Sequence, residues 1–423
     1  MKSILTDNDR PNLPLPEPIR GLDPDSFANF TLSERLPGIA RRVLRENSWS
    51  EKSARKLEKL AAEMPHGSLT PMPDDRGPDI QDWNRYIKPY QGMSYLEAPW
   101  FTAETYFFRR IIEACGYYRN GPERGRDPYS GIKLEGMETV AGSLENLYKD
   151  LPDHLSSARG TQSDTLDKLI YLLGAIVWGN RADLSLFPAE KNEPGQMNTP
   201  GDGEERFLVD DRGIIGEYLI SAAGKNTRID IVLDNGGLEL AYDLALADFL
   251  LDSGLCGVVH LHTKPHPTYV SDATTTDVLG MIDSLGLSSR PDTLALAKRL
   301  CGYLETGALK IQSSYYWTSP LFGWQMEENL MKELSVADLL ISKGDANYRR
   351  WIGDFHWPFE TPIKDILGYL PVPIAFTRIF KSNCAAGLDP ERVKTTQEID
   401  QNWLYNGKWG IIQFFHPGAT SIK

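Results

Sequence analysis

The second half of the chain alternates short apolar, β-branched runs with longer helical stretches, and this alternation constrains the fold more than any other feature. Helical periodicity covers residues 238–251, 276–287 and 291–306. Strands that are apolar along their length and separated by crossover helices predict a mostly parallel sheet covered on both faces. We therefore expect an α/β protein with a three-layer α/β/α sandwich. The candidate strands are residues 230–233, 256–261, 308–311, 338–341, 373–376 and 410–414.

The first half of the chain has a different pattern. Residues 1–30 carry five prolines among polar residues, which predicts an extended arm on the surface. From residue 32 to about 118 apolar residues recur at helical spacing, which predicts a helical region. The change from helical to alternating pattern falls near residue 205.

Composition and charge exclude several classes of function. The 45 basic and 58 acidic residues give a net charge of −13, which argues against a nucleic-acid partner. An anionic ligand would need a few local cations. Four cysteines without a CxxC pair predict neither a zinc ribbon nor a disulfide framework. Because we find no signal-peptide pattern and no apolar run of about 20 residues, we expect a cytoplasmic protein with no membrane partner.

Oxygen ligands follow the first two candidate strands. Asp234 and Asn235 end the first, and Gly236 and Gly237 then allow a tight turn into a helix. Asp272 follows the second strand. Carboxylate and amide oxygens suit Mg²⁺ or Mn²⁺, although the same residues also form Asx turns and helix caps. The pattern of His260, His262 and His266 resembles a zinc site, but we disfavour zinc because no second metal motif accompanies it.

Cations follow two further strands. Lys343 and Gly344 precede a helix start at which backbone amides can bind a phosphate. Arg378 and Lys381 follow the strand at 373–376, and basic residues at a helix N-terminus are unfavourable unless an anion compensates them. Solvated loops would explain each feature separately. Together they place oxygen ligands and cations at one sheet edge, which is typical of phosphoryl transfer or phosphate ester hydrolysis.

Several blocks of the sequence resemble the damage-control phosphatase family, formerly a domain of unknown function numbered 89. The similarity is closest to its sugar-phosphate branch, which is also described as protein-glutamate O-methyltransferase. The RTxK motif of that branch appears as Arg378-Ile379-Phe380-Lys381, with Ile379 replacing threonine. The other matching blocks are residues 97–106 with 109–111, 180–185, 234–240 with 243–244 and 247–250, 270–272, 343–349 and 407–410.

The resemblance implies an enzyme that hydrolyses small sugar phosphates, such as fructose 1-phosphate or fructose 6-phosphate, in metabolite damage control. It implies a divalent metal (Mn²⁺, Mg²⁺, Co²⁺ or Ni²⁺) held by Asp234, Asn235 and Asp272. Glu239 would lie near the sugar or the metal-bound water. The phosphate would meet Lys381 and the loop made of Lys343, Gly344, Asp345, Ala346 and Asn347.

The resemblance also implies a helical N-terminal domain, and it moves the domain boundary earlier than residue 205. We therefore expect an arm over 1–30, a helical domain over 31–165 and a catalytic α/β domain over 166–423.

The chemistry can be outlined from these residues. Arg378, Lys381 and Lys343 would neutralise phosphoryl charge in the transition state. Asp345 or Glu239 would orient the attacking water, and the sequence does not choose between them. A phospho-aspartate route is disfavoured because Gly236 stands where such enzymes carry a second aspartate.

Two other functions remain as alternatives. An S-adenosylmethionine-dependent carboxyl methyltransferase is one, although no GxGxxG turn is present. A non-catalytic sugar-phosphate binding protein is the other.

Overall fold

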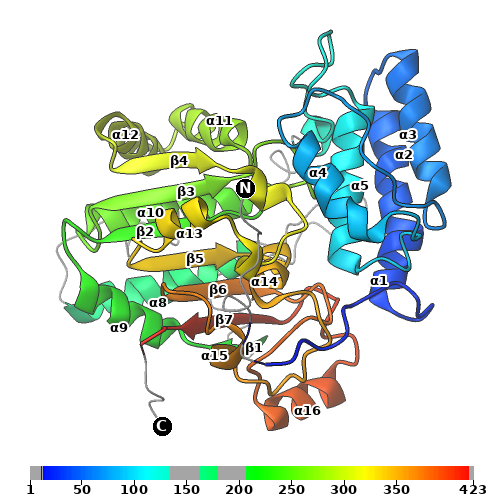
Figure 1. Ribbon diagram of the computed structural model, residues 1–423. Coiled ribbons are helices and arrows are strands. Elements are labelled where there is room, and N and C mark those ends of the chain that lie inside the picture. The colour runs from blue at the N-terminus through cyan, green and yellow to red at the C-terminus, as the bar shows by residue number, and fades with distance from the viewer. Residues whose placement is uncertain (1–10, 12, 134–161, 180–205, 419–423) are drawn as a thin grey trace.

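The computed structural model describes residues 11, 13–133, 162–179 and 206–418, and in this part of the chain seven strands form one sheet (Figure 1). The strand order is β1-β7-β6-β5-β2-β3-β4, and every neighbouring pair is parallel except β6 with β7. All six predicted strands are present, and β1 is the one that the sequence pattern missed. The strands are β1 (Phe207–Asp210), β2 (Arg228–Val232), β3 (Val258–Thr263), β4 (Leu309–Ser313), β5 (Leu339–Lys343), β6 (Ile374–Ile379) and β7 (Gly410–Phe415).

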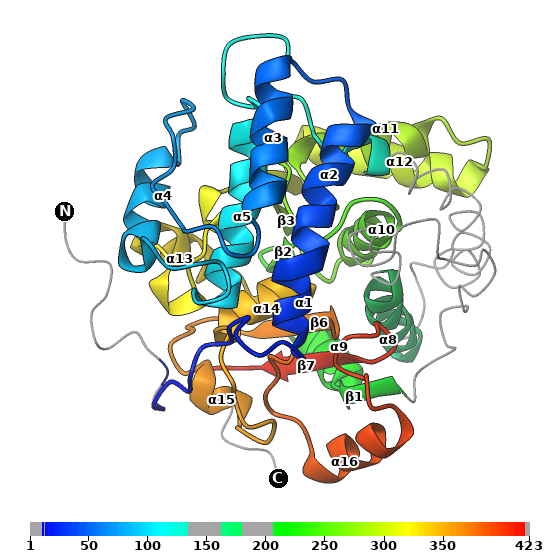
Figure 2. The same ribbon diagram turned by 90° about the vertical axis from the view of Figure 1, so that its right-hand side faces the viewer.

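Helices cover both faces of the sheet, which confirms the predicted α/β sandwich. Helices α8 and α10 lie on one side of the strands, and α13 and α14 lie on the other (Figure 2). None of the described helices is long and apolar enough to span a membrane. The helices of this part are α8 (Gln162–Trp178), α9 (Arg212–Ala222), α10 (Leu238–Asp252), α11 (Thr275–Gly286), α12 (Pro291–Thr306), α13 (Glu328–Leu334), α14 (Asp345–Ile352), α15 (Ile363–Ile366) and α16 (Pro390–Ile399).

The central strands are apolar throughout because alternate side chains enter two different cores. Leu340 and Ile374 join the core that continues into the N-terminal helices. Leu339, Ile341 and Ala375 join the core beneath helices α8 to α12. The helical region therefore shares its core with one face of the sheet.

The N-terminal region is helical, as the sequence predicts, and lies beside the carboxyl ends of the parallel strands (Figure 1). Amphipathic spacing explains α2, whose Leu36, Ile39 and Val43 are buried on one side. Ser50 caps α3 by accepting a hydrogen bond from the Ser53 amide. The helices are α1 (Phe27–Phe30), α2 (Leu36–Glu46), α3 (Glu51–Glu63), α4 (Ile80–Ile87) and α5 (Trp100–Ala114).

The described part of the N-terminal arm is extended, but it is pinned between two elements instead of lying loosely on the surface. Ile19 is buried, its amide donates to the Asp354 carbonyl at 3.0 Å, and its carbonyl accepts from the Trp100 amide at 2.8 Å. Pro18 pairs with Phe355 in a short antiparallel bridge. The arm thereby links the start of α5 to the turn after α14.

A buried polar cluster joins the helical region to the loop after β3. Arg109 on α5 is fully buried and makes bidentate bonds to Asp75 and Asp79, with N–O distances of 2.8 to 3.0 Å. His266 Nε2 lies 3.9 Å from Asp79 Oδ2, while its Nδ1 lies 3.0 Å from the Pro267 carbonyl oxygen. Burial, together with the nearby Arg109 and against the opposing effects of Asp79 and Asp75, lowers the pKa of His266 to about 4.

The depressed pKa of His266 predicts that the contribution of this residue to stability becomes unfavourable as pH falls. The unfolded chain binds the imidazole proton below about pH 6.5 and the native protein does not, so the His266 contribution to the free energy of unfolding falls by about 2 kcal/mol from pH 7.5 to pH 5. The groups facing this imidazole are Asp75, Asp79, Arg109, Tyr117, Tyr118 and Tyr315. Chemical denaturation at both pH values should show that His266→Gln removes this loss.

The matched control is His66→Gln, because His66 is exposed and should leave the pH dependence as in the wild type. Parallel stability–pH curves for wild type and His266→Gln would contradict the prediction.

Candidate active site

Two polar segments meet just beyond the carboxyl end of β2. Asn235 and Asp272 pair in a short antiparallel bridge. The Gly236 amide donates to the Ser271 carbonyl and the Ala273 amide to the Asp234 carbonyl, both at 2.7 Å. This pairing brings Asp234, Asn235 and Asp272 together, as expected from the sequence, and all three side chains are buried.

A glycine lets the neighbouring strand approach the Asp234 carboxylate. Gly344 follows β5 with φ +82, and a Cβ built there would lie 2.0 Å from Asp234 Oδ2. A larger residue would suffer both backbone strain and a direct clash at this position. Gly344 therefore acts by leaving space.

Negative charge on the Asp234 carboxylate is disfavoured at this site. Burial raises the pKa of Asp234 well above its usual value, and the neighbouring Glu239 and Asp272 carboxylates raise it further. Lys264 and Lys381 oppose this rise in the pKa of Asp234. The ammonium group of Lys264 lies 3.2 Å from Asp272 Oδ2 and donates to the Leu233 carbonyl at 2.6 Å. Two buried carboxylates and an amide make a donor set suited to a hard divalent cation.

Lys343 lies behind the pocket, which corrects the expectation that it faces a phosphate. Its side chain is fully buried, with Nζ 2.9 Å from Glu239 Oε1 and 3.1 Å from Asp243 Oδ1. It also donates to the Ile176 carbonyl. Glu239 in turn accepts from Asn235 Nδ2 at 2.9 Å, so Lys343 supports the acidic cluster from below.

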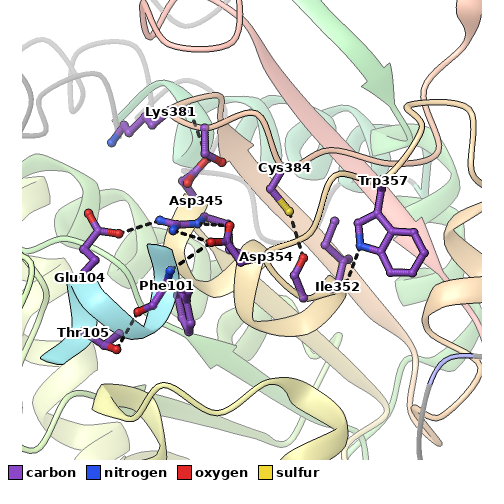
Figure 3. Close-up of polar contacts among 12 residues, drawn as sticks. Phe101, Glu104, Thr105, Asp345, Ile352, Asp354, Trp357, Lys381 and Cys384 are labelled. Atoms are coloured by element: carbon purple, nitrogen blue, oxygen red, sulfur yellow. Dashed lines mark hydrogen bonds and ion pairs between the residues drawn. The ribbon is translucent and has the colours of Figure 1, made fainter. Parts of the chain in front are cut away.

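The expectation that Arg378 faces the phosphate is corrected in the same way. It is fully buried with its guanidinium over the Tyr348 ring, and Nη2 lies 2.7 Å from Asp345 Oδ1. The backbone amide of Lys381 and the Ser382 hydroxyl donate to the same carboxylate oxygen at 3.2 and 3.1 Å. Asp345 and Lys381 lie next to each other in Figure 3.

The structure separates the expected site residues into two groups. Lys381, Asp345 and Ala346 line one pocket together with Asp234, Asn235 and Asp272. Glu239, Lys343, Gly344, Asn347 and Arg378 are not among its lining residues. Asn347 donates from Nδ2 to the Leu233 and Lys343 carbonyls at 3.2 and 2.8 Å, so it holds the two strand ends in place.

The sequence predicts that the helical domain supplies the opposite wall of this pocket, but it did not single out the residues of that wall as site residues. The wall is made by Arg35, Trp100 and Glu104 of the helical region together with Tyr269 and Arg349. A carboxylate one turn after a tryptophan, within the mostly apolar block at 97–106, is the signal that could have pointed to α5.

Arg349 of α14 connects this wall to the sheet side of the pocket by ion pairs. It binds Glu104 Oε2 and Asp354 Oδ1, each at 2.8 Å, and its guanidinium lies 3.8 Å from the centre of the Trp100 ring. Asp354 also accepts from the Phe101 amide at 3.1 Å, and Figure 3 shows Glu104 and Asp354 on the two sides of this network.

The loop that carries Asp272 is strained. Tyr269 and Val270 have φ angles of +48 and +69, a region that bulky and β-branched residues rarely adopt. Such strain persists only where the surroundings enforce it, and it concentrates at functional sites. Here it accompanies the placement of Tyr269 in the pocket and of Asp272 beside Asn235.

The histidines on β3 serve the fold. His262 Nε2 lies 2.8 Å from Asp230 Oδ2 on the neighbouring strand β2, and His260 Nδ1 lies 4.0 Å from the same carboxylate. Within the described residues, no group of three His, Cys, Asp or Glu side chains is placed to hold a metal. Any cation site at the end of β2 therefore depends on the amide of Asn235.

Comparison with known sequences identifies one family. The family described as the damage-control phosphatase ARMT1-like domain matches residues 31–395. The "Damage-control phosphatase ARMT1" of Danio rerio is 29% identical over 93% of this chain and 95% of its own length. The protein of the same name from Mus musculus is 30% identical over 93% and 97%. A crystal structure of a DUF89 family protein from Pyrococcus horikoshii is 15% identical, with a TM-score of 0.42 over 86% of this chain and 94% of that one.

The close approach of Gly344 to Asp234 predicts that a side chain at position 344 destabilises the protein. Gly344→Ala should lower the free energy of unfolding by about 3 kcal/mol, because it combines an unfavourable φ with a clash against Asp234. Gly280→Ala is the matched control, since Gly280 lies in α11 with open space around its Cβ position. That substitution should stabilise the protein by about 0.5–1 kcal/mol. Equal effects of the two substitutions in urea titrations would refute the packing argument.

Proposed function

The chain belongs to the damage-control phosphatase ARMT1-like family, and on this premise we propose that it is a metal-dependent phosphomonoester hydrolase acting on small sugar phosphates. The fructose 1-phosphate and fructose 6-phosphate type is the substrate class that we propose. One observation carries the proposal. A single pocket holds the acid–amide cluster of Asp234, Asn235 and Asp272 and also the cation Lys381 and the first turn of α14.

The acid–amide cluster fits a divalent cation. The buried carboxylates of Asp234 and Asp272 raise each other's free energy in the absence of a cation, as the raised pKa of Asp234 indicates. We propose that these two residues and Asn235 hold Mn²⁺, Mg²⁺, Co²⁺ or Ni²⁺. When bound, such an ion polarises a phosphoryl oxygen.

The phosphate is held by groups of the chain on the other side of the pocket. Lys381 supplies a full positive charge, and Ala346 lies in the first turn of α14, where backbone amides and the helix dipole favour an anion. These groups neutralise charge on the phosphoryl oxygens as it shifts during the reaction.

Asp345 is the better candidate to orient the attacking water. It lines the pocket, whereas Glu239 is bonded to Lys343 and Asn235 beneath it. The contacts of Asp345 with Arg378, Lys381 and Ser382 all end on Oδ1. We propose that Asp345 accepts a proton as the water oxygen bonds to phosphorus. The ester P–O bond then breaks, and the alcohol leaves with a proton from solvent.

Loss of one acid of the cluster should abolish the activity. Asp234→Asn keeps the shape of the side chain and removes its charge, so phosphate release from fructose 1-phosphate should fall on the order of 1,000-fold. Asp292→Asn in the first turn of α12 is the matched surface control and should keep full activity. Unchanged turnover of Asp234→Asn, measured with each divalent metal, would remove the basis for this site.

Substitutions of Lys381 and Lys343 at the sheet edge should have different effects on phosphate binding and on stability. Lys381→Met removes a pocket cation, so inhibition by inorganic phosphate should weaken about 10-fold or more while stability changes little. Lys343→Met leaves Glu239 and Asp243 buried without their cation, and should lower the free energy of unfolding by about 3–5 kcal/mol. Phosphate inhibition and chemical denaturation of both variants measure these effects. The same response from both would contradict the division of roles.

A further inference from the structure

Two residues that line the pocket carry buried hydrogen-bonding groups that have no partner among the described residues. Trp100 is 1% exposed, and its indole Nε1–H makes no hydrogen bond in this part of the chain. The phenolic oxygen of Tyr269 is buried and likewise makes none. Both residues line the same pocket as Asp234 and Lys381. Buried polar groups are nearly always satisfied in native proteins, so two such groups at one pocket point to a ligand that satisfies them.

Both residues are held firmly in place. The Arg349 guanidinium covers the Trp100 ring at 3.8 Å, and Phe27 packs edge-on against the same ring with a centroid distance of 6.1 Å. The Tyr269 ring packs against Phe108 at 4.7 Å, on a backbone with φ +48. Neither ring can turn to find another partner without losing these contacts.

An acceptor lies on the same wall. Glu104 is one helical turn after Trp100 on α5 and also lines the pocket. Its Oε2 is bonded to Arg349 at 2.8 Å, whereas Oε1 lies 3.8 Å from the nearest Arg35 nitrogen, which is longer than a hydrogen bond. The wall therefore offers donors and an acceptor within the part of the pocket made by the helical region.

We propose that Trp100 and Tyr269 are specificity-determining residues that donate hydrogen bonds to hydroxyl groups on the leaving group of the phosphate ester. This inference rests on the proposed phosphatase function. A hydroxyl can accept from the indole or phenol and donate to Glu104, which a carbonyl or an ammonium group cannot do. With phosphate at Lys381, the organic part of the ester extends toward this wall. The site thereby selects polyol phosphates over alkyl phosphates.

The selection follows from unsatisfied donors. A site built to bond a hydroxyl discriminates strongly against an analogue that lacks it, because the analogue leaves the buried donors without partners. An ester without hydroxyl groups would fill the pocket but leave Trp100 and Tyr269 as they are in the free protein.

The test compares a hexose phosphate, fructose 1-phosphate, with n-butyl phosphate, which carries no hydroxyl. Trp100→Phe and Tyr269→Phe each remove one donor and keep an aromatic ring. For each variant, kcat/KM for fructose 1-phosphate should fall 10- to 100-fold, while that for n-butyl phosphate should change less than about two-fold. Trp49→Phe and Tyr218→Phe are matched controls, because their donors are bonded to backbone carbonyls elsewhere. Both controls should resemble the wild type with both esters.

Several outcomes would overturn the inference. Equal losses on the two esters would assign Trp100 and Tyr269 a structural role, and no loss on either would leave water as the partner of these groups. Thermal melting checks that each variant folds. If Trp100→Phe does not fold, the Tyr269→Phe comparison decides.

Failure of the proposed function is recognised separately, because wild-type protein would then release no phosphate from either ester. Calorimetric binding of the same two esters decides the inference in that case. Trp100→Phe and Tyr269→Phe should weaken binding of fructose 1-phosphate 10- to 100-fold and leave n-butyl phosphate unaffected. Equal effects on the two esters would again overturn it.

Discussion

The structure depends on how it tolerates several buried carboxylates at the end of β2. Asp234, Asp272 and Glu239 lie together where burial penalises their charge and each raises the free energy of the others. Three lysines on different sides of the cluster offset this free-energy cost of buried negative charge. Lys343 supports Glu239 from within the sheet, Lys264 lies against Asp272, and Lys381 faces the pocket. A bound divalent cation would stabilise the carboxylates further, and the proposed reaction uses the same carboxylates to hold that cation.

The helical region is needed for the site, because it supplies the wall that the sheet lacks. Arg349 connects the two by binding Glu104 of α5 and Asp354 after α14, and Asp354 caps the start of α5 through the Phe101 amide. The hydrophobic core also runs from the helices into one face of the sheet. The pocket is therefore a product of both parts, with phosphate chemistry at the sheet edge and recognition of the organic group on the helical wall.

The sequence predicts the sheet and the acidic cluster well, since both follow from local pattern. The sequence pattern did not predict β1, because this strand has only four residues and the last of them is the polar Asp210. The sequence could not show that Lys343 and Arg378 are buried in ion pairs whereas Lys381 lines the pocket. The first two lie within strands β5 and β6, whose side chains stand perpendicular to the sheet and are buried beside carboxylates. Lys381 lies two residues beyond β6 and lines the pocket.

Trp100 and Tyr269 were missed as site residues because only tertiary packing brings α5 to the loop after β3. Residues 180–185, another block of the family resemblance, lie outside the described part of the chain.

The most direct test of the central claim is whether the acid–amide cluster and the facing cations act as one site. Isothermal titration calorimetry would measure binding of inorganic phosphate to the wild-type protein, first after chelation and then with saturating Mn²⁺. We expect phosphate to bind at least about ten times more tightly with the metal present, because the ion offsets the negative charge of Asp234 and Asp272. Equal phosphate affinity with and without a divalent metal would contradict it.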